Sequence, residues 1–128
     1  MSTGIIVFAH GSRIASANDA VRTITAELMK AGSFDHVEAA FLELGRPELR
    51  GAVARLAARG VRRIMVIPYF LTLGTHLERD LPRLVQSVGR EYQDVELVVT
   101  PPLDGHPALL QILLDRAAAA GKAGESKA

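Results

Sequence analysis

The sequence predicts an α/β protein whose open, mainly parallel four-stranded sheet carries helices on both faces. Four apolar, β-branched runs alternate with four segments of helical periodicity, and the runs at 5–9 and 64–71 are apolar at nearly every position. Strands of that composition are typical of parallel sheets that are covered on both faces. Because a helix follows each strand, right-handed crossovers would place successive strands parallel.

The four predicted strands are the apolar runs of the chain, and each is rich in residues that favour strands. They lie at residues 5–9 (IIVFA), 37–44 (VEAAFLEL), 64–71 (IMVIPYFL) and 95–101 (VELVVTP). Each ends in a short polar or glycine-containing segment. The spacing between the runs leaves room for one helix after every strand.

Apolar residues three or four positions apart predict four helices. The apolar positions are Val21, Ile24 and Leu28 in the first helix, Leu49, Val53 and Leu56 in the second, Leu77, Leu81, Leu84, Val85 and Val88 in the third, and Leu109, Leu110, Leu113 and Leu114 in the fourth, which runs on into residues 117–120. Gly32 and Gly60 are typical C-terminal stops, and Pro47 fits the first turn of the second helix.

The start of the third helix has two possible positions. Thr75 and Glu78 match a capping box, which places His76 in the first turn. Pro82 would interrupt a helix that begins there. Either the first turn is separate, or the helix begins near Asp80 with Pro82 in its own first turn.

Length and composition predict one domain in the cytoplasm. The chain of 128 residues suits a single domain at residues 1–120, and the small, polar residues 121–128 are expected to form a disordered tail. No basic leader precedes the first apolar run, so we expect no signal peptide. The longest apolar run, at 64–71, is far shorter than the roughly 20 residues that span a bilayer.

The charge and cysteine content exclude several classes of function. A net charge of +1 and 5% aromatic residues argue against a nucleic-acid or membrane surface. The chain has no cysteine, which excludes thiolate metal sites and cysteine nucleophiles and fits a reducing compartment.

Three side chains that can bind a metal ion follow successive strands. His10 follows the first strand, Glu43 lies near the end of the second, 33 residues later, and His76 follows the third after another 33 residues. Ligands of open α/β sheets bind at the carboxyl ends of the strands, so these residues should share one rim. Two histidines and a carboxylate suit a divalent first-row metal and leave coordination positions open. Alternatively, Glu43 pairs with Arg46.

Other residues of this rim suit a flat, acidic ligand. Gly11 and Gly74 would let such a ligand approach the backbone, and Arg13 and Arg46 would bind its carboxylates. Gly11 to Arg13 could also hold a phosphate, but the chain has no glycine-rich nucleotide motif.

Two further histidines fit the predicted site less well. His36 precedes the second strand, which places it at the opposite edge of the sheet. His106, in the segment DGHPALL, has the position of a helix entry, with Pro107 in the first turn of the fourth helix.

Several segments closely resemble the small class II chelatases, the sirohydrochlorin chelatases of the CbiX type. They are AHGSR at 9–13, FLELGRP at 41–47 and PYFLTLGTHLERDLP at 68–82, and LDGHP at 103–107 is similar to the family's fourth strand–helix junction. The resemblance extends to about residue 118. It implies a chelatase-like fold with flavodoxin-like layering of helices over the sheet.

The resemblance also implies a reaction, namely ATP-independent insertion of a divalent metal into sirohydrochlorin, a tetrapyrrole rich in carboxylates. Cobalt is the first expectation, with iron and nickel as alternatives, in the biosynthesis of cobalamin or sirohaem. The metal would be a substrate, and no permanently bound cofactor is expected. The chain corresponds to the short form of the family, which implies a homodimer.

By the same resemblance, His10 would be a metal ligand and proton acceptor, and His76 the second ligand. Glu43 matches an acidic position found in many members, and whether it is ligand, base or structural stays open. The residues expected to line the macrocycle are Gly11, Ser12, Arg13, Arg46, Phe70, Leu71, Thr72, Leu73, Gly74 and Thr75.

Two alternatives to a chelatase are considered. The first is a histidine phosphatase-like hydrolase, because AHGS is superficially similar to an R-H-G signature; Ala9 stands where that arginine would be, however, and the chain is short for that fold. The second is a carrier that binds the metal or the tetrapyrrole without catalysing insertion.

Overall fold

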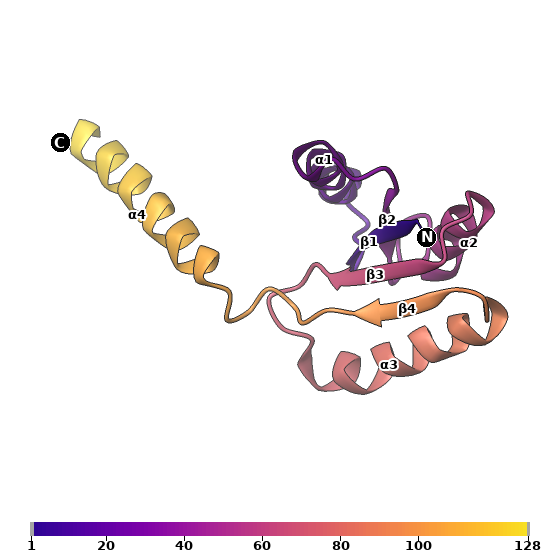
Figure 1. Ribbon diagram of the computed structural model, residues 1–128. Helices are drawn as coiled ribbons and strands as arrows, with labels where there is room; N and C mark the ends of the chain where they lie inside the picture. Colours follow the sequence, from indigo (N-terminus) through magenta and orange to yellow (C-terminus); the bar gives the residue numbers. More distant parts are fainter. Residues whose placement is uncertain (1, 128) are drawn as a thin grey trace.

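The chain folds into alternating strands and helices in the computed structural model, which describes residues 2–127 (Figure 1). The elements are β1 (Thr3–Ala9), α1 (Ala15–Gly32), β2 (Val37–Phe41), α2 (Leu49–Ala58), β3 (Arg63–Pro68), α3 (Gly74–Glu91), β4 (Glu96–Val99) and α4 (Pro107–Lys127). The four strands form one parallel sheet in the order β2-β1-β3-β4. The predicted fold class is therefore confirmed.

The pairing of β1 with β2 continues beyond the ends of both strands. Ala9 lies opposite Phe41, after which the Leu42 N–H donates to the Ala9 carbonyl at 2.9 Å and the Glu43 N–H donates to the His10 carbonyl at 3.1 Å. The predicted second strand extended to residue 44, but β2 ends at Phe41. The loop that follows contains Leu44 in the left-handed region, at φ +57°, and folds back so that the carbonyl of Pro47 accepts from the Phe41 N–H at 2.9 Å.

The third and fourth strands are also shorter than predicted. β3 ends at Pro68 and β4 at Val99, although the sequence predicted strands to residues 71 and 101. Beyond β3, single hydrogen bonds replace the ladder: the Tyr69 N–H donates to the carbonyl of Phe8 at 2.7 Å. The chain has therefore left the sheet before it reaches residues 70–75.

Helices cover both faces of the sheet, as predicted. On one face, α2 and α3 bury a core around Phe8, Ile64 and Val66, with Leu56 and Val88 from the helices. Each of these side chains contributes about 1.5–3 kcal/mol by leaving water.

On the opposite face, α1 covers β1 and β2. Val21 of this helix packs on Val7 and Phe41 of the strands. The prediction that Ile24 shares this buried face is wrong, because its side chain is 40% exposed. Asn18 and Thr25 are buried beside Val21 instead.

The second and third helices begin at positions that differ from the predicted ones. α2 begins at Leu49, so Pro47 precedes the helix rather than lying in its first turn. α3 begins at Gly74 and continues past Pro82 as one helix. The predicted capping box is absent, because Thr75 is already the second helical residue and the N-cap, Leu73, makes no side-chain hydrogen bond.

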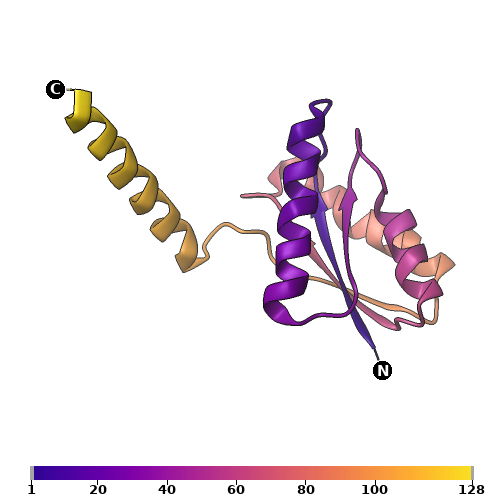
Figure 2. The same cartoon turned by 90° about the horizontal axis from the view of Figure 1, so that it is seen from above.

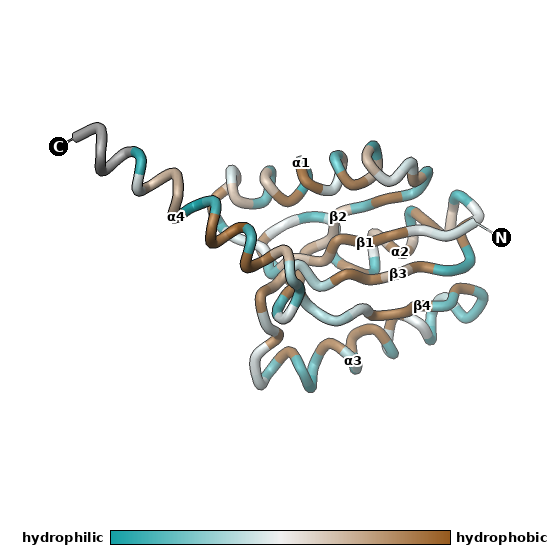
Figure 3. Tube along the Cα trace, turned by 60° about the vertical axis from the view of Figure 1, so that its left-hand side comes forward, coloured by the Kyte–Doolittle hydropathy of each residue, from teal (hydrophilic) through white to brown (hydrophobic). Residues whose placement is uncertain are grey.

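Helix α4 projects away from the domain and covers neither face of the sheet (Figures 1 and 2). Its first half is apolar (Figure 3), with Leu110, Leu113 and Leu114 more than half exposed. It continues to Lys127, although a disordered tail was expected from residue 121; residues 117–120 are all alanine, which favours helix. Residue 128 lies outside the described residues. None of the helices within residues 2–127 is long and apolar enough to cross a membrane.

Candidate metal-binding rim

The rim at the carboxyl ends of β1 and β2 brings His10 and Glu43 together. The His10 Nδ1 and the Glu43 Oε1 lie 4.0 Å apart, and the two side chains are 56% and 59% exposed. This separation is too long for a hydrogen bond, so the two groups face each other without a direct bond. A nitrogen and a carboxylate oxygen in this arrangement can both reach a third atom placed between them.

An aromatic contact supports the imidazole ring of His10 on the side of the protein core. The ring of Phe70 meets it edge-on, with the ring centroids 6.1 Å apart. Phe70 in turn packs edge-on against Phe8 at 6.2 Å, and Phe8 is fully buried. Edge-to-face pairs of this kind are favourable, so the core helps to orient His10. Phe70, predicted to line the site, does lie beside it.

The two predicted glycines of the rim differ in their surroundings. Gly11 adopts φ +94°, and a Cβ at this position would overlap the carbonyl oxygen of Glu43. The close approach expected of Gly11 is therefore made by the neighbouring loop of the same chain. Gly74 adopts φ +72° and has open space around it.

His76 does not join His10 and Glu43 in this structure. It is exposed on the first turn of α3, and no three His, Asp or Glu side chains within residues 2–127 form a group that could hold a metal ion. The loop that leads to it is bonded to the segment between β4 and α4, because the Leu103 and Asp104 N–H groups donate to the carbonyls of Phe70 and Leu71 at 2.9 and 2.8 Å.

The predicted arginines lie on exposed segments of the rim. Arg13 follows the His10 loop and Arg46 follows the Glu43 loop, and both side chains are exposed. The alternative ion pair between Glu43 and Arg46 does not occur in the described part of the chain, where Glu43 faces His10.

The remaining residues of the predicted lining divide into exposed and structural ones. Leu71, Thr72 and Thr75 are exposed, whereas Leu73 is half-buried and packs against the core. The Ser12 hydroxyl accepts a hydrogen bond from the N–H of Ile14 at 3.0 Å, so it stabilises its own loop.

The two weaker histidine candidates lie apart from the rim pair. The carbonyl of His36 accepts from the N–H of Ile5 at the opposite end of the sheet, where the strands begin. The Nδ1 of His36 is buried without a hydrogen-bond partner. The Nδ1 of His106 accepts from the N–H of Ala108 at 3.0 Å. His106 is thus the entry to α4, as predicted.

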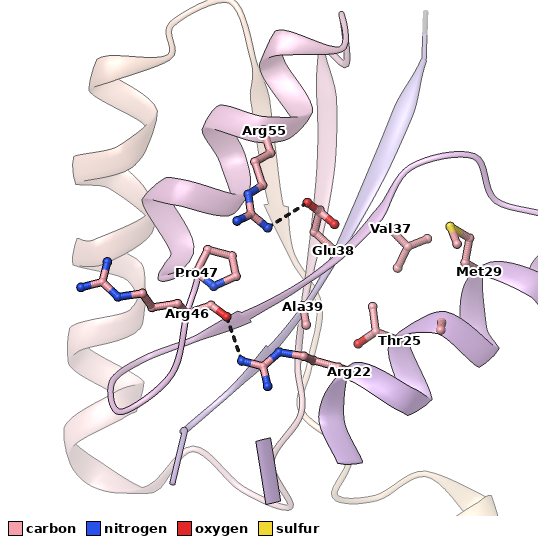
Figure 4. A pocket seen from close by; sticks show the side chains of 10 residues that line it. Arg22, Thr25, Met29, Val37, Glu38, Ala39, Arg46, Pro47 and Arg55 are labelled. Atoms are coloured by element: carbon pink, nitrogen blue, oxygen red, sulfur yellow. Dashed lines mark hydrogen bonds and ion pairs between the residues drawn. The ribbon is translucent and has the colours of Figure 1, made fainter. Parts of the chain in front are cut away.

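Two features were missed by the sequence predictions. The first is Asn18, a buried side chain that contacts both rim loops; its signal in the sequence was its position three residues before Val21 on the buried face of α1. The second is a groove of about 440 Å³ along the outer edge of β2 (Figure 4). There Arg22 donates to the carbonyl of Arg46 at 3.1 Å and Arg55 pairs with Glu38 at 3.6 Å.

Comparison with known sequences supports the resemblance seen in the motifs. The model of the CbiX family matches residues 4–120. The sirohydrochlorin cobaltochelatases of Methanopyrus kandleri and Saccharolobus islandicus are 30% and 33% identical to this chain; in each case 88% of this chain aligns, with 92% and 91% of the relative. The chloroplastic sirohydrochlorin ferrochelatase of Arabidopsis thaliana is 31% identical, and the aligned 88% of this chain spans only 50% of that protein.

Solved structures agree with the fold. A CbiX protein from Marinobacter aquaeolei superposes with a TM-score of 0.83 at 27% identity, over 94% of this chain and 98% of that one. SirB from Bacillus subtilis with Fe³⁺ gives a TM-score of 0.69 at 28% identity, over 80% of this chain and 40% of that one. The chain therefore belongs to the CbiX family of chelatases.

Proposed function

We propose that this protein inserts a divalent metal ion into sirohydrochlorin without ATP. The observation that carries the proposal is the open His10–Glu43 pair at the rim of a CbiX-family chain. Relatives that align over nine-tenths of their own length are named sirohydrochlorin cobaltochelatases. The family assignment also argues against the histidine phosphatase alternative.

The rim pair has the chemical groups that metal insertion needs. Two pyrrole N–H protons must leave the macrocycle, and the metal must exchange its bound ligands for pyrrole nitrogens. His10 and Glu43 supply one group that holds the metal and one that accepts the two protons in turn and releases each to the surrounding water, since both side chains are exposed. Since both side chains are more than half exposed, the metal is held from one side and can be passed on.

We assign the second metal ligand to His76. It lies at the end of the segment that starts with Phe70, and Phe70 contacts His10, so one short stretch of chain connects the two histidines. Arg13 and Arg46 are exposed on the segments that follow His10 and Glu43, and they would bind the carboxylates of the macrocycle bidentately. Gly11, Ser12 and residues 70–75 complete the proposed lining.

Cobalt is the metal we favour. The two relatives that match this chain in length are named cobaltochelatases, whereas the named ferrochelatase is twice as long as the aligned part. Iron and nickel stay as alternatives, because histidine and carboxylate accept several divalent ions. We propose that the metal is a substrate, that no cofactor is permanently bound, and that the protein acts in the cytoplasm.

We further propose that the active form is a homodimer in which two chains exchange α4. Within residues 2–127, α1 covers β1 and β2 while α2 and α3 lie on the opposite face, so no helix packs on β3 and β4 from the α1 side. Met65 and Ile67 belong to the core on that face and are only partly buried, and Val98 lies opposite Met65. This is the place that a fourth helix would cover in a sheet layered on both faces.

The helix that should fill this place lies elsewhere. Leu110, Leu113 and Leu114 are 63%, 67% and 54% exposed on an α4 that projects from the domain (Figure 3). The exposed apolar side of α4 and the partly exposed apolar face of β3 and β4 are therefore complementary surfaces. A second copy supplies both missing halves, and the exchange closes with twofold symmetry.

The reaction is tested by following the absorbance of sirohydrochlorin with Co²⁺, Fe²⁺ and Ni²⁺. Wild type is compared with His10→Ala, His76→Ala and the control His36→Asn, which removes a histidine at the opposite end of the sheet. We expect insertion faster than the spontaneous rate for wild type and the control, and large losses for the other two. Binding without turnover would identify a carrier, and wild-type rates in both rim variants would refute the mechanism.

A further inference from the structure

A buried asparagine joins the two loops that carry His10 and Glu43. Asn18 lies on α1 and is 7% exposed. Its Oδ1 accepts from the N–H of Ser12 at 3.0 Å, and its Nδ2 donates to the carbonyls of Ser12 at 2.9 Å and Leu44 at 2.8 Å. Ser12 is two residues beyond His10, and Leu44 follows Glu43 directly. The amide therefore contacts one loop two residues after His10 and the other loop one residue after Glu43.

These loops need external support because their backbones are unusual. Gly11 adopts φ +94° and Leu44 adopts φ +57°. A left-handed conformation costs a residue with a Cβ about 1–2 kcal/mol, so Leu44 holds it only where its surroundings require it. Where the loops leave the sheet, they are linked by the hydrogen bond that the Glu43 N–H donates to the carbonyl of His10. On the side of α1, Asn18 is the link.

The space around the amide is closely fitted. A Cβ on Gly45 would lie 3.1 Å from the Asn18 Nδ2 and 2.8 Å from the ring of Phe41. A side chain at residue 45 would therefore force Phe41 to shift and would press on the Asn18 amide. Gly45 and Asn18 together determine where the Glu43 loop lies.

A stability role alone would favour an apolar residue at this position. Asn18 shares the buried face of α1 with Val21, and burying an amide costs free energy unless its hydrogen bonds are made. All three of its bonds go to the backbone of the two rim loops. These bonds need two N–H donors and one acceptor on the same side chain, and only an amide side chain has that set.

We propose that Asn18 is a positioning residue for metal insertion: it fixes the loops so that the Nδ1 of His10 and the Oε1 of Glu43 stay 4.0 Å apart. This inference rests on the proposed function of the pair. Asn18 touches neither the metal nor the macrocycle in this scheme. It acts through the two loops.

The test compares Asn18→Asp and Asn18→Ser with Thr25→Val. The aspartate keeps the size and the acceptor for Ser12 but turns a negative charge toward the two carbonyls that Asn18 now donates to. Thr25 is buried on the same helix face, but its hydroxyl donates only to the carbonyl of Val21, so its variant is a matched control.

We expect the kcat of metal insertion to fall about tenfold or more in both Asn18 variants, since misplaced reacting groups commonly cost that much. The KM for sirohydrochlorin should stay within about twofold, because no contact with the macrocycle is removed. Thr25→Val should leave both constants within about twofold of wild type. Wild-type kcat in both Asn18 variants, or an equal loss in Thr25→Val, would overturn the proposal.

Amide hydrogen exchange tests the same inference without the reaction. The Glu43 N–H bonds to His10 rather than to Asn18, and the Ile5 N–H bonds to His36 at the other end of the sheet. In the Asn18 variants, exchange at Glu43 should accelerate about tenfold relative to Ile5. Equal acceleration at both positions would refute the positioning role. A wild type without chelatase activity would refute only the proposed function, and the exchange result would still decide for or against the loop contact.

Discussion

The carbonyl oxygen of Glu43 occupies the space that a side chain at Gly11 would need. Gly11→Ala should therefore lower the free energy of unfolding more than Gly60→Ala, which has a similar φ of +89° but open space around it. We expect the difference to be about 1–3 kcal/mol, the usual cost of forcing atoms into a packed region. Urea denaturation of both variants measures it. Equal losses would mean that the rim loops separate easily.

The carboxylate of Glu43 should matter for the reaction and little for folding. Glu43→Gln is expected to lower kcat by about 10²–10⁴-fold, the usual contribution of a general base or acid. The free energy of unfolding should change by less than about 0.5 kcal/mol, since the side chain is 59% exposed. Glu96→Gln is the matched control, because Glu96 is 63% exposed and pairs with Arg63 at the other end of the sheet. Unchanged kcat in Glu43→Gln would show that the carboxylate of Glu43 takes no part in the mechanism.

A charge on the apolar face of α4 should dissociate the proposed dimer. Leu113→Glu removes two buried leucines per dimer, worth about 1.5–3 kcal/mol each, so association should weaken by about 10²–10⁴-fold. Ala119→Glu is the control, since residues 111, 115 and 119 are four apart and share one side of the helix, with Gln111 bonded to Asp115 on it. Sedimentation equilibrium measures both variants. A monomeric wild type, or equal effects of the two substitutions, would exclude the exchange of α4.

Replacing the proline inside α3 should stabilise the helix. Pro82 lacks the N–H that would donate to the carbonyl of Glu78, and its side chain is exposed. Pro82→Ala restores the donor, and we expect about 1–2 kcal/mol of added stability after the greater freedom of the unfolded chain is subtracted. Chemical denaturation measures the change, with the exposed neighbour Arg83→Ala as a control within about 0.5 kcal/mol. A loss of stability would show that the proline ring makes packing contacts that outweigh the missing bond.

The sequence was sufficient to predict the alternation of strands and helices from periodicity, and helices on both faces from strands that are apolar at nearly every position; the order β2-β1-β3-β4 in the sheet was not predicted. It also predicted that His10 and Glu43 meet at one rim, since both follow parallel strands. The ends of the elements were less predictable. The residues up to Leu44 have the composition of a strand, but β2 ends at Phe41, and Leu44 adopts a left-handed conformation that composition does not predict.

The role of Asn18 could not be deduced from local pattern. Its position three residues before Val21 indicates the buried face of α1, but its partners, Ser12 and Leu44, come from two separate loops. The direction in which α4 leaves the domain could not be predicted from the sequence either. Its leucines predict a helix, but whether they cover their own sheet depends on contacts that no spacing encodes.

The continued pairing of β1 and β2 makes the chemistry of the rim depend on the far end of the sheet. Side chains alternate along a strand, so a slip of β2 by one residue would turn its side chains to the opposite faces of the sheet and move Glu43 out of its place beside His10. What opposes that slip is the burial of Val37 against the core under α1, four residues before Phe41. An apolar anchor at one end of the strand thus selects which functional group is presented at the other.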